Sequence, residues 1–178
     1  MLTADKRQGG FTLIEVMIAL TLLALLMGIG VPTFRSWIQN SQVRTAADGV
    51  IAGIQLARSE AIRRNKPVEF DLRTGADWSV VLVSPRTTIQ DRKGNAGTKN
   101  AVFTVTPAGA DRLTFNPVGA PSGNNQDGSF PIQQIDITSS QTVDGLRPLR
   151  IVVSVAGSVR LCDPDPKLSA GDPRRCTN

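Results

Sequence analysis

The sequence predicts an α+β protein: one long N-terminal helix, membrane-spanning in its first half, packs on an antiparallel β-sheet head with a disulfide-closed C-terminal tail. Three observations predict this class. An apolar run lies near the N-terminus, a stretch with helical periodicity follows it, and the remainder alternates with a period of two. We therefore divide the chain into a leader at residues 1–10, a transmembrane helix at 11–32, an amphipathic helix at 33–66 and a β-rich head at 67–178.

The apolar run extends from Phe11 to Val31, and Glu15 is its one charged residue. A helix of about 20 residues, with a rise of roughly 1.5 Å per residue, crosses a hydrocarbon core of roughly 30 Å. Lys6 and Arg7 precede the run, and basic residues stay on the cytoplasmic side. The N-terminus is therefore expected in the cytoplasm and the head outside it.

Glu15 is unusual because a carboxylate in a bilayer costs about 2.5–3.5 kcal/mol on insertion scales. Either Glu15 reaches back to the membrane interface, or it pairs with a positive group. In an ordinary secretory signal the small residues of the cleavage site follow the apolar region. Here Gly9 and Gly10 precede it. A cut after Gly10 would create an α-amine on Phe11, and this amine in a neighbouring copy could be the partner of Glu15.

The second half of the helix is predicted from an apolar stripe with spacings of three and four residues. Lys66-Pro67 is expected to end the helix, because the residue before proline disfavours helical geometry. The stripe consists of Val43, Ala47, Val50, Ile54, Ala57 and Ala61.

The head is predicted to contain six to eight strands, because short alternating segments are separated by turn residues. Residues 85–100 are expected to form a polar, basic loop, and residues 117–131 a second loop. Strands are expected at 68–72, 78–84, 101–106, 112–116, 132–138, 147–155 and 159–161.

Composition argues against catalysis. The chain has no histidine, which removes the commonest general base and metal ligand, so we expect no enzyme, metal or cofactor. Its two cysteines, Cys162 and Cys176, are expected to form a disulfide in an exported protein, if the pairing is intramolecular. The net charge of +5 allows anionic partners such as DNA or lipid headgroups, although a solvated basic surface is the simpler explanation and is favoured here.

Two sets of motifs carry a family resemblance. Gly10-Phe-Thr-Leu-Ile-Glu15, after a short basic leader, resembles the class III signal of type IV pilins and type II secretion pseudopilins. Residues 55–62 and 113–123 resemble the helix end and a strand-turn of the GspH/FimT family of minor pilins and pseudopilins. The resemblance implies a type IV pilin-like fold, cleavage by a prepilin peptidase between Gly10 and Phe11, methylation of the Phe11 amine, and docking of Glu15 into a helical filament.

The same resemblance implies partners and a location. The partners would be other pilins or pseudopilins and an assembly platform in the bacterial inner membrane. The protein would be single-pass with a periplasmic head, and would then enter a pilus or pseudopilus. The favoured function is a minor pilin that initiates a type IV pilus or occupies its tip. The alternative is a GspH-like pseudopilin of the type II secretion system.

DNA binding is a function of another class. Some FimT-like pilins take up DNA through a tail motif of the form Gly-Arg-x-Arg, and this chain has Gly157-Ser-Val-Arg160 there, which matches it in part. Arg160, Arg174 and Arg175 are the candidate DNA contacts, and Arg147 is among the other arginines that could contact phosphates.

Overall fold

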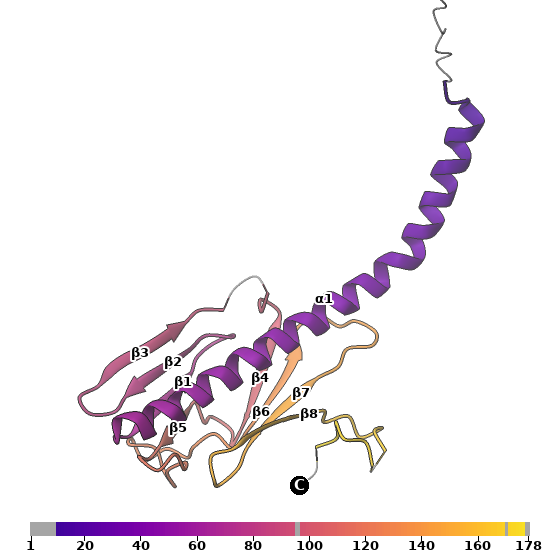
Figure 1. The fold of residues 1–178 in the computed structure, drawn as a ribbon. Helices are drawn as coiled ribbons and strands as arrows, with labels where there is room; N and C mark the ends of the chain where they lie inside the picture. The colour runs from indigo at the N-terminus through magenta and orange to yellow at the C-terminus, as the bar shows by residue number, and fades with distance from the viewer. Residues whose placement is uncertain (1–9, 95–96, 170, 177–178) are drawn as a thin grey trace, which may run out of the picture. The chain divides into compact units, whose positions relative to one another are not determined.

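A computed structural model describes residues 10–94, 97–169 and 171–176, apart from the side chains of residues 29–33. The chain divides into two compact units, Met1–Arg35 and Ser36–Asn178. The predicted leader lies outside the described residues except for Gly10. The head, the second unit, combines a helix with two sheets (Figure 1).

One helix, α1 (Leu13–Arg64), belongs to both units and confirms the predicted helical region. It ends because Asn65 adopts a left-handed conformation, with φ of 50°, just before Lys66-Pro67. Arg63 and Arg64 in the last turn both bind the carboxylate of Glu60, at 2.6 Å. Hydrogen bonds from these two guanidinium groups lower the pKa of Glu60 to about 2.

The α1 residues of the first unit, described by themselves, carry exposed apolar side chains such as Leu13, Met17, Leu20 and Leu25. None of the helices among the described residues has the length and apolar content that a membrane span requires. The predicted anchor at 11–32 includes residues 29–32, whose side chains lie outside that description.

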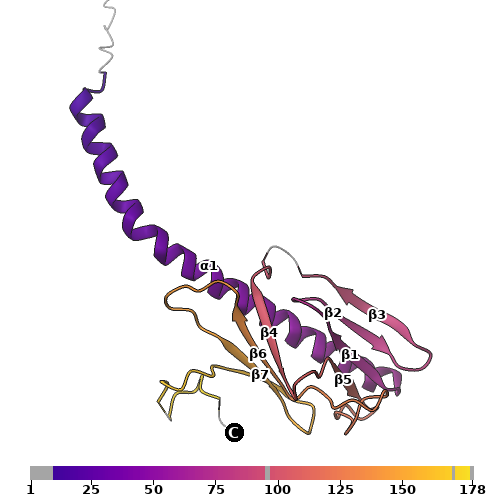
Figure 2. The ribbon, with the colours of Figure 1, turned by 180° about the vertical axis from the view of Figure 1, so that it is seen from behind.

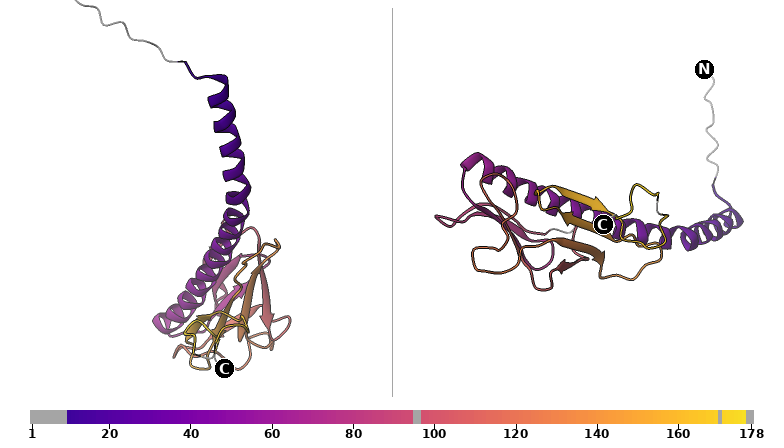
Figure 3. Two further views of the ribbon diagram at one scale, coloured as in Figure 1. Left: turned by 90° about the vertical axis from the view of Figure 1, so that its right-hand side faces the viewer. Right: turned by 90° about the horizontal axis from the view of Figure 1, so that it is seen from below.

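Across the described residues of the head there are two four-stranded sheets, and every strand pairing within them is antiparallel. Both sheets lie on the same side of α1 (Figures 2 and 3). The first sheet has the order β3-β2-β1-β5 and the second the order β4-β6-β7-β8. The strands are β1 (Val68–Leu72), β2 (Trp78–Leu82), β3 (Thr87–Arg92), β4 (Ala101–Thr106), β5 (Arg112–Phe115), β6 (Gln134–Ser139), β7 (Leu149–Val153) and β8 (Val159–Cys162).

The core lies between α1 and the inner faces of the two sheets. All six residues of the predicted apolar stripe are buried, together with Phe70 and Phe115 from the strands. Gly53 allows the close approach of helix and sheet, because a Cβ there would lie 2.7 Å from the ring of Phe70 and 2.9 Å from that of Trp78. Gly53 has a low intrinsic helix propensity, yet its lack of a side chain allows α1 to pack closely against the sheet.

The prediction of one loop at 85–100 was wrong, because β3 occupies Thr87–Arg92. This strand is a polar edge strand, and its side chains are mostly exposed on both faces, so the sequence shows no apolar alternation. It pairs with β2 through a register shift between Val80 and Val81. Arg86, in the turn before β3, binds the buried carboxylate of Glu69 at 2.9 Å and ties the hairpin to β1.

Candidate functional site

The first candidate site is the N-terminal turn of α1. Thr12 is the N-cap residue: its hydroxyl oxygen accepts a hydrogen bond from the backbone N–H of Glu15 at 3.3 Å. Its carbonyl oxygen accepts one from the N–H of Val16 at 3.2 Å. Gly10 and Phe11 precede the helix and are exposed, so the backbone between them is accessible.

The pattern Thr12-x-x-Glu15 is that of a capping box, and an acidic residue in the first turn also interacts favourably with the helix dipole. Sequence reasoning considered Glu15 as an interfacial or intersubunit residue and missed this local role. The spacing of threonine and glutamate would have predicted it. The structure shows the threonine half of this box, the bond from the Glu15 N–H to the Thr12 hydroxyl, and it places the Glu15 carboxylate in the first turn of α1.

The second candidate site is the C-terminal tail, which a disulfide between Cys162 and Cys176 closes as predicted. The backbone N–H of Asp163 donates to the carbonyl of Arg174 at 2.7 Å, and the N–H of Cys176 donates to the carbonyl of Asp163 at 3.2 Å. The tail therefore returns to the end of β8 and lies against it.

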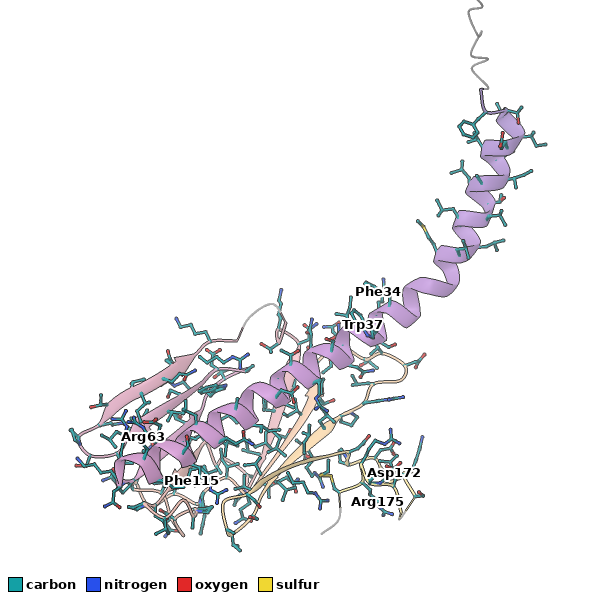
Figure 4. All side chains as sticks on the ribbon, in the orientation of Figure 1. Phe34, Trp37, Arg63, Phe115, Asp172 and Arg175 are labelled. Carbon is teal, nitrogen blue, oxygen red and sulfur yellow. A yellow bond between two sulfur atoms is a disulfide. The ribbon has the colours of Figure 1, made fainter. Side chains whose placement is uncertain are left out.

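This return brings the three candidate DNA contacts into one region, but it does not leave all of them equally available. The guanidinium of Arg160 donates to the backbone carbonyl of Arg175 at 3.3 Å. Arg174 forms a two-point contact with the carboxylate of Asp172, at 2.7 and 3.1 Å. Figure 4 shows Asp172 and Arg175 together in the tail. Asp172 therefore offsets the charge of Arg174.

This contact shifts the pKa values of both Asp172 and Arg174. Hydrogen bonds from the side chain and the backbone of Arg174 lower the pKa of Asp172 to about 2. The same pairing raises the pKa of Arg174. At neutral pH this pair contributes no net charge to the tail.

The glycine of the partial Gly157-Ser-Val-Arg160 motif has a structural role. Gly157 lies in the turn between β7 and β8 with φ of 78°, and a Cβ there would overlap the carbonyl oxygen of Gly119. Arg58 of α1 binds the same Gly119 carbonyl at 3.0 Å and the Ala156 carbonyl at 3.2 Å. Close packing of two turns and the helix therefore requires glycine at this position.

A groove of about 400 Å³ lies between α1, β7, β8 and the tail, and sequence reasoning did not find it. Three arginines, Arg44, Arg147 and Arg174, line it from segments far apart in the sequence. Asn40 fixes the loop that carries Arg147: its side chain accepts a hydrogen bond from the Arg147 N–H at 2.8 Å and donates one to the Gly145 carbonyl at 3.0 Å. No local motif indicates this arrangement.

Comparison with known proteins gives two matching families. The family described as type II transport protein GspH matches residues 46–157, and the prokaryotic N-terminal methylation motif matches residues 5–31. The type IV major alpha-pilin of Moraxella bovis is 26% identical over 155 residues, which cover 86% of this chain and 91% of that protein.

Two crystal structures of the type IV minor pilin FimU from Pseudomonas aeruginosa are similar to this chain at 20% sequence identity. Their TM-scores are 0.49 and 0.46, and the similarity covers 66% and 67% of this chain and 90% and 87% of theirs.

Proposed function

The chain belongs to the family of type II transport protein GspH, and from this membership we propose that it is a minor pilin that assembles into or initiates a type IV pilus. One observation carries the proposal: an N-terminal methylation motif over residues 5–31 stands in the same chain as a GspH head over residues 46–157. A processing signal joined to a small β-rich head is what a filament subunit needs.

Processing would occur between Gly10 and Phe11. Both residues precede the helix and are exposed, and among the described residues no atom beyond the chain neighbours lies within 4 Å of where a Gly10 Cβ would be, so a prepilin peptidase has room to bind the backbone there. The new amine of Phe11 would then be methylated. Cleavage removes the basic leader and leaves an apolar N-terminal segment.

The apolar segment at 11–32 would be the anchor in the bacterial inner membrane, with the head in the periplasm. Lys6 and Arg7, together with the single charge in the run from Phe11 to Val31, support this orientation. Glu15 would pair with the Phe11 amine of a neighbouring subunit, since an unpaired carboxylate in a bilayer is costly. Other pilins and the assembly platform of the inner membrane would be the partners.

The competing assignment is a GspH-like pseudopilin of the type II secretion system, which the family's own description supports. The match to a type IV pilin over 91% of its length favours the pilus. Deleting the gene and restoring it separates the two functions when surface pili and secreted proteins are both measured. Loss of pili with normal secretion supports the pilus, the reverse supports secretion, and no change in either contradicts both.

Cleavage itself is tested by mass spectrometry of the mature N-terminus. We expect a chain that begins with methylated Phe11 in the parent, and an uncut chain when Gly10 is replaced by a bulky charged residue. A mature protein that begins at Met1, or after the apolar run, would contradict the filament-subunit proposal as a whole.

A second candidate function is DNA binding by the tail. The hydrogen bond between the Arg160 guanidinium and the Arg175 carbonyl favours it, because it places two of the three candidate residues side by side. The pairing of Arg174 with Asp172 opposes it. We propose that any DNA contact is to phosphates, since an arginine cluster without a groove-reading helix binds without regard to sequence.

A further inference from the structure

The groove lined by Arg44, Arg147 and Arg174, here called the arginine groove, has an apolar floor. Leu149 of β7 and Leu161 of β8 are partly buried against the core, and Cys162 of the disulfide is buried beside them. The arginines come from α1, from the loop before β7 and from the tail, so they form a rim around this floor. The surface combines arginine side chains with partly buried aliphatic carbon, and the carboxylates of Asp48, Asp163 and Asp172 offset much of the positive charge.

The three rim arginines differ in how their charge is balanced. Arg44 pairs with Asp48 at 3.1 Å, and Arg174 pairs with Asp172 at 2.7 Å. Among the ion pairs of the described residues, none includes Arg147, and its side chain is exposed. Asp163 adds one negative charge to the lining. Arg147 is therefore the rim cation with the most to gain from an external carboxylate.

The shape of the groove distinguishes between classes of anionic partner. A volume of about 400 Å³ falls in the range of small-molecule and side-chain pockets, roughly 300–1,000 Å³, and is far too small to admit a duplex. Among the residues that the structure describes, the lining includes no aromatic side chain on which a nucleic-acid base could stack. The aliphatic side chains of the floor also make no favourable interaction with a phosphate group. A short protein segment with a carboxylate next to an aliphatic side chain fits both features, because the carboxylate can pair with a rim arginine while the aliphatic side chain covers the floor.

We propose that the arginine groove docks an acidic, aliphatic segment of a neighbouring filament subunit. The carboxylate pairs with Arg147, and the adjacent aliphatic side chain covers Leu149 and Leu161. Asn40 is a positioning residue, because its two hydrogen bonds hold the loop of Arg147 against α1. The inference rests on the proposed role as a filament subunit and gives the head its own contact, separate from the anchor.

The test is direct binding to the full chain in detergent. The probe is a dye-labelled, end-capped peptide in which acidic residues alternate with leucine. One control peptide carries the corresponding amides in place of the acids, and another carries alanine in place of leucine. We expect the first peptide to bind and both controls to bind at least about tenfold more weakly, since a factor of ten corresponds to one modest interaction.

Variants locate the site. Arg147→Gln should weaken binding of the acidic peptide about tenfold and reduce its salt dependence. Lys66→Gln removes the same charge from an exposed residue outside the groove and should leave binding unchanged. Asn40→Ala removes no charge, yet it should also weaken binding because the Arg147 loop loses both of its hydrogen bonds to α1.

Several results would overturn the inference: equal binding of the amide peptide, equal binding by Arg147→Gln and the parent, no binding at low salt, or displacement of the peptide by duplex DNA. Failure here is distinguishable from failure of the proposed function. A chain that is cut after Gly10 and enters filaments, but whose groove binds no acidic peptide, refutes the docking site alone.

Discussion

Arg174 and Asp172 form a two-point ion pair in the tail, with guanidinium nitrogens 2.7 and 3.1 Å from the two carboxylate oxygens. The pair lies within the disulfide-closed loop, with Arg174 two residues and Asp172 four residues before Cys176, and the backbone N–H of Arg174 also donates to the Asp172 carboxylate at 2.9 Å. One acidic residue therefore orders the backbone of the tail and neutralises one of its arginines. Both effects can be measured.

The ion pair predicts the pH response of the tail. Because the pKa of Asp172 is lowered to about 2 in the folded protein, its contribution is complete above the ordinary carboxylate pKa, near 3.8, and is lost as the pH falls toward 2. A carboxyl-detected NMR titration should place the midpoint of Asp172 near pH 2. Arg174→Gln should raise that midpoint toward 3.8, whereas Arg44→Gln should not. A midpoint near 4 in the parent would contradict the ion pair.

The Arg174–Asp172 ion pair also predicts which tail arginines contribute most to DNA affinity. In a salt titration with a labelled duplex, Arg160→Gln and Arg175→Gln should each weaken binding and flatten the dependence of log K on log salt by about 0.9. Arg174→Gln should have a smaller effect, because Asp172 already offsets its charge. Asp172→Asn should strengthen binding. Lys99→Gln, an exposed charge on another segment, is the control. Absence of binding at low salt would leave the tail a solvated basic surface.

Glu15 has two candidate roles, and two substitutions separate them. Glu15→Gln keeps a side chain that suits a capping box but removes the charge, whereas Thr12→Val removes the cap and keeps the charge. We expect Glu15→Gln to insert into the membrane normally and to lose incorporation into filaments. Thr12→Val should cost about 0.5–2 kcal/mol of helix stability and affect incorporation less. If Glu15→Gln assembles as well as the parent, the charge is not needed.

Gly157 is predicted to be sensitive to substitution. Gly157→Ala should lower the free energy of unfolding by more than the roughly 1–2 kcal/mol of a left-handed alanine, because its Cβ would also overlap the Gly119 carbonyl. Gly145 is the matched control: its φ is 76°, and a Cβ there has no neighbour within 4 Å. Denaturant unfolding of the two variants should show a clear difference. Equal losses would mean that the turns do not pack as closely as described.

Local pattern in the sequence was enough to predict α1, the buried stripe from Val43 to Ala61, seven of the eight strands and the Cys162–Cys176 pair. Helical and strand periods are properties of consecutive residues, and two cysteines allow one intramolecular pairing. The strand β3 was missed because an edge strand with two polar faces has no apolar period. The order of the strands in the two sheets was likewise beyond any local signal.

The candidate sites likewise divide into those that the local sequence predicts and those that only tertiary packing forms. The motif from Gly10 to Glu15 was readable because its residues are adjacent, and so were the basic residues of the tail. The arginine groove was not, because Arg44, Arg147 and Arg174 are brought together only when the strands pair and the disulfide returns the tail to β8. The pairing of Arg174 with Asp172, by contrast, is local, because the two residues are two positions apart in the same turn. Sequence thus determined which segments are helix and strand, and long-range packing decided which charged side chains of distant segments lie on the same surface.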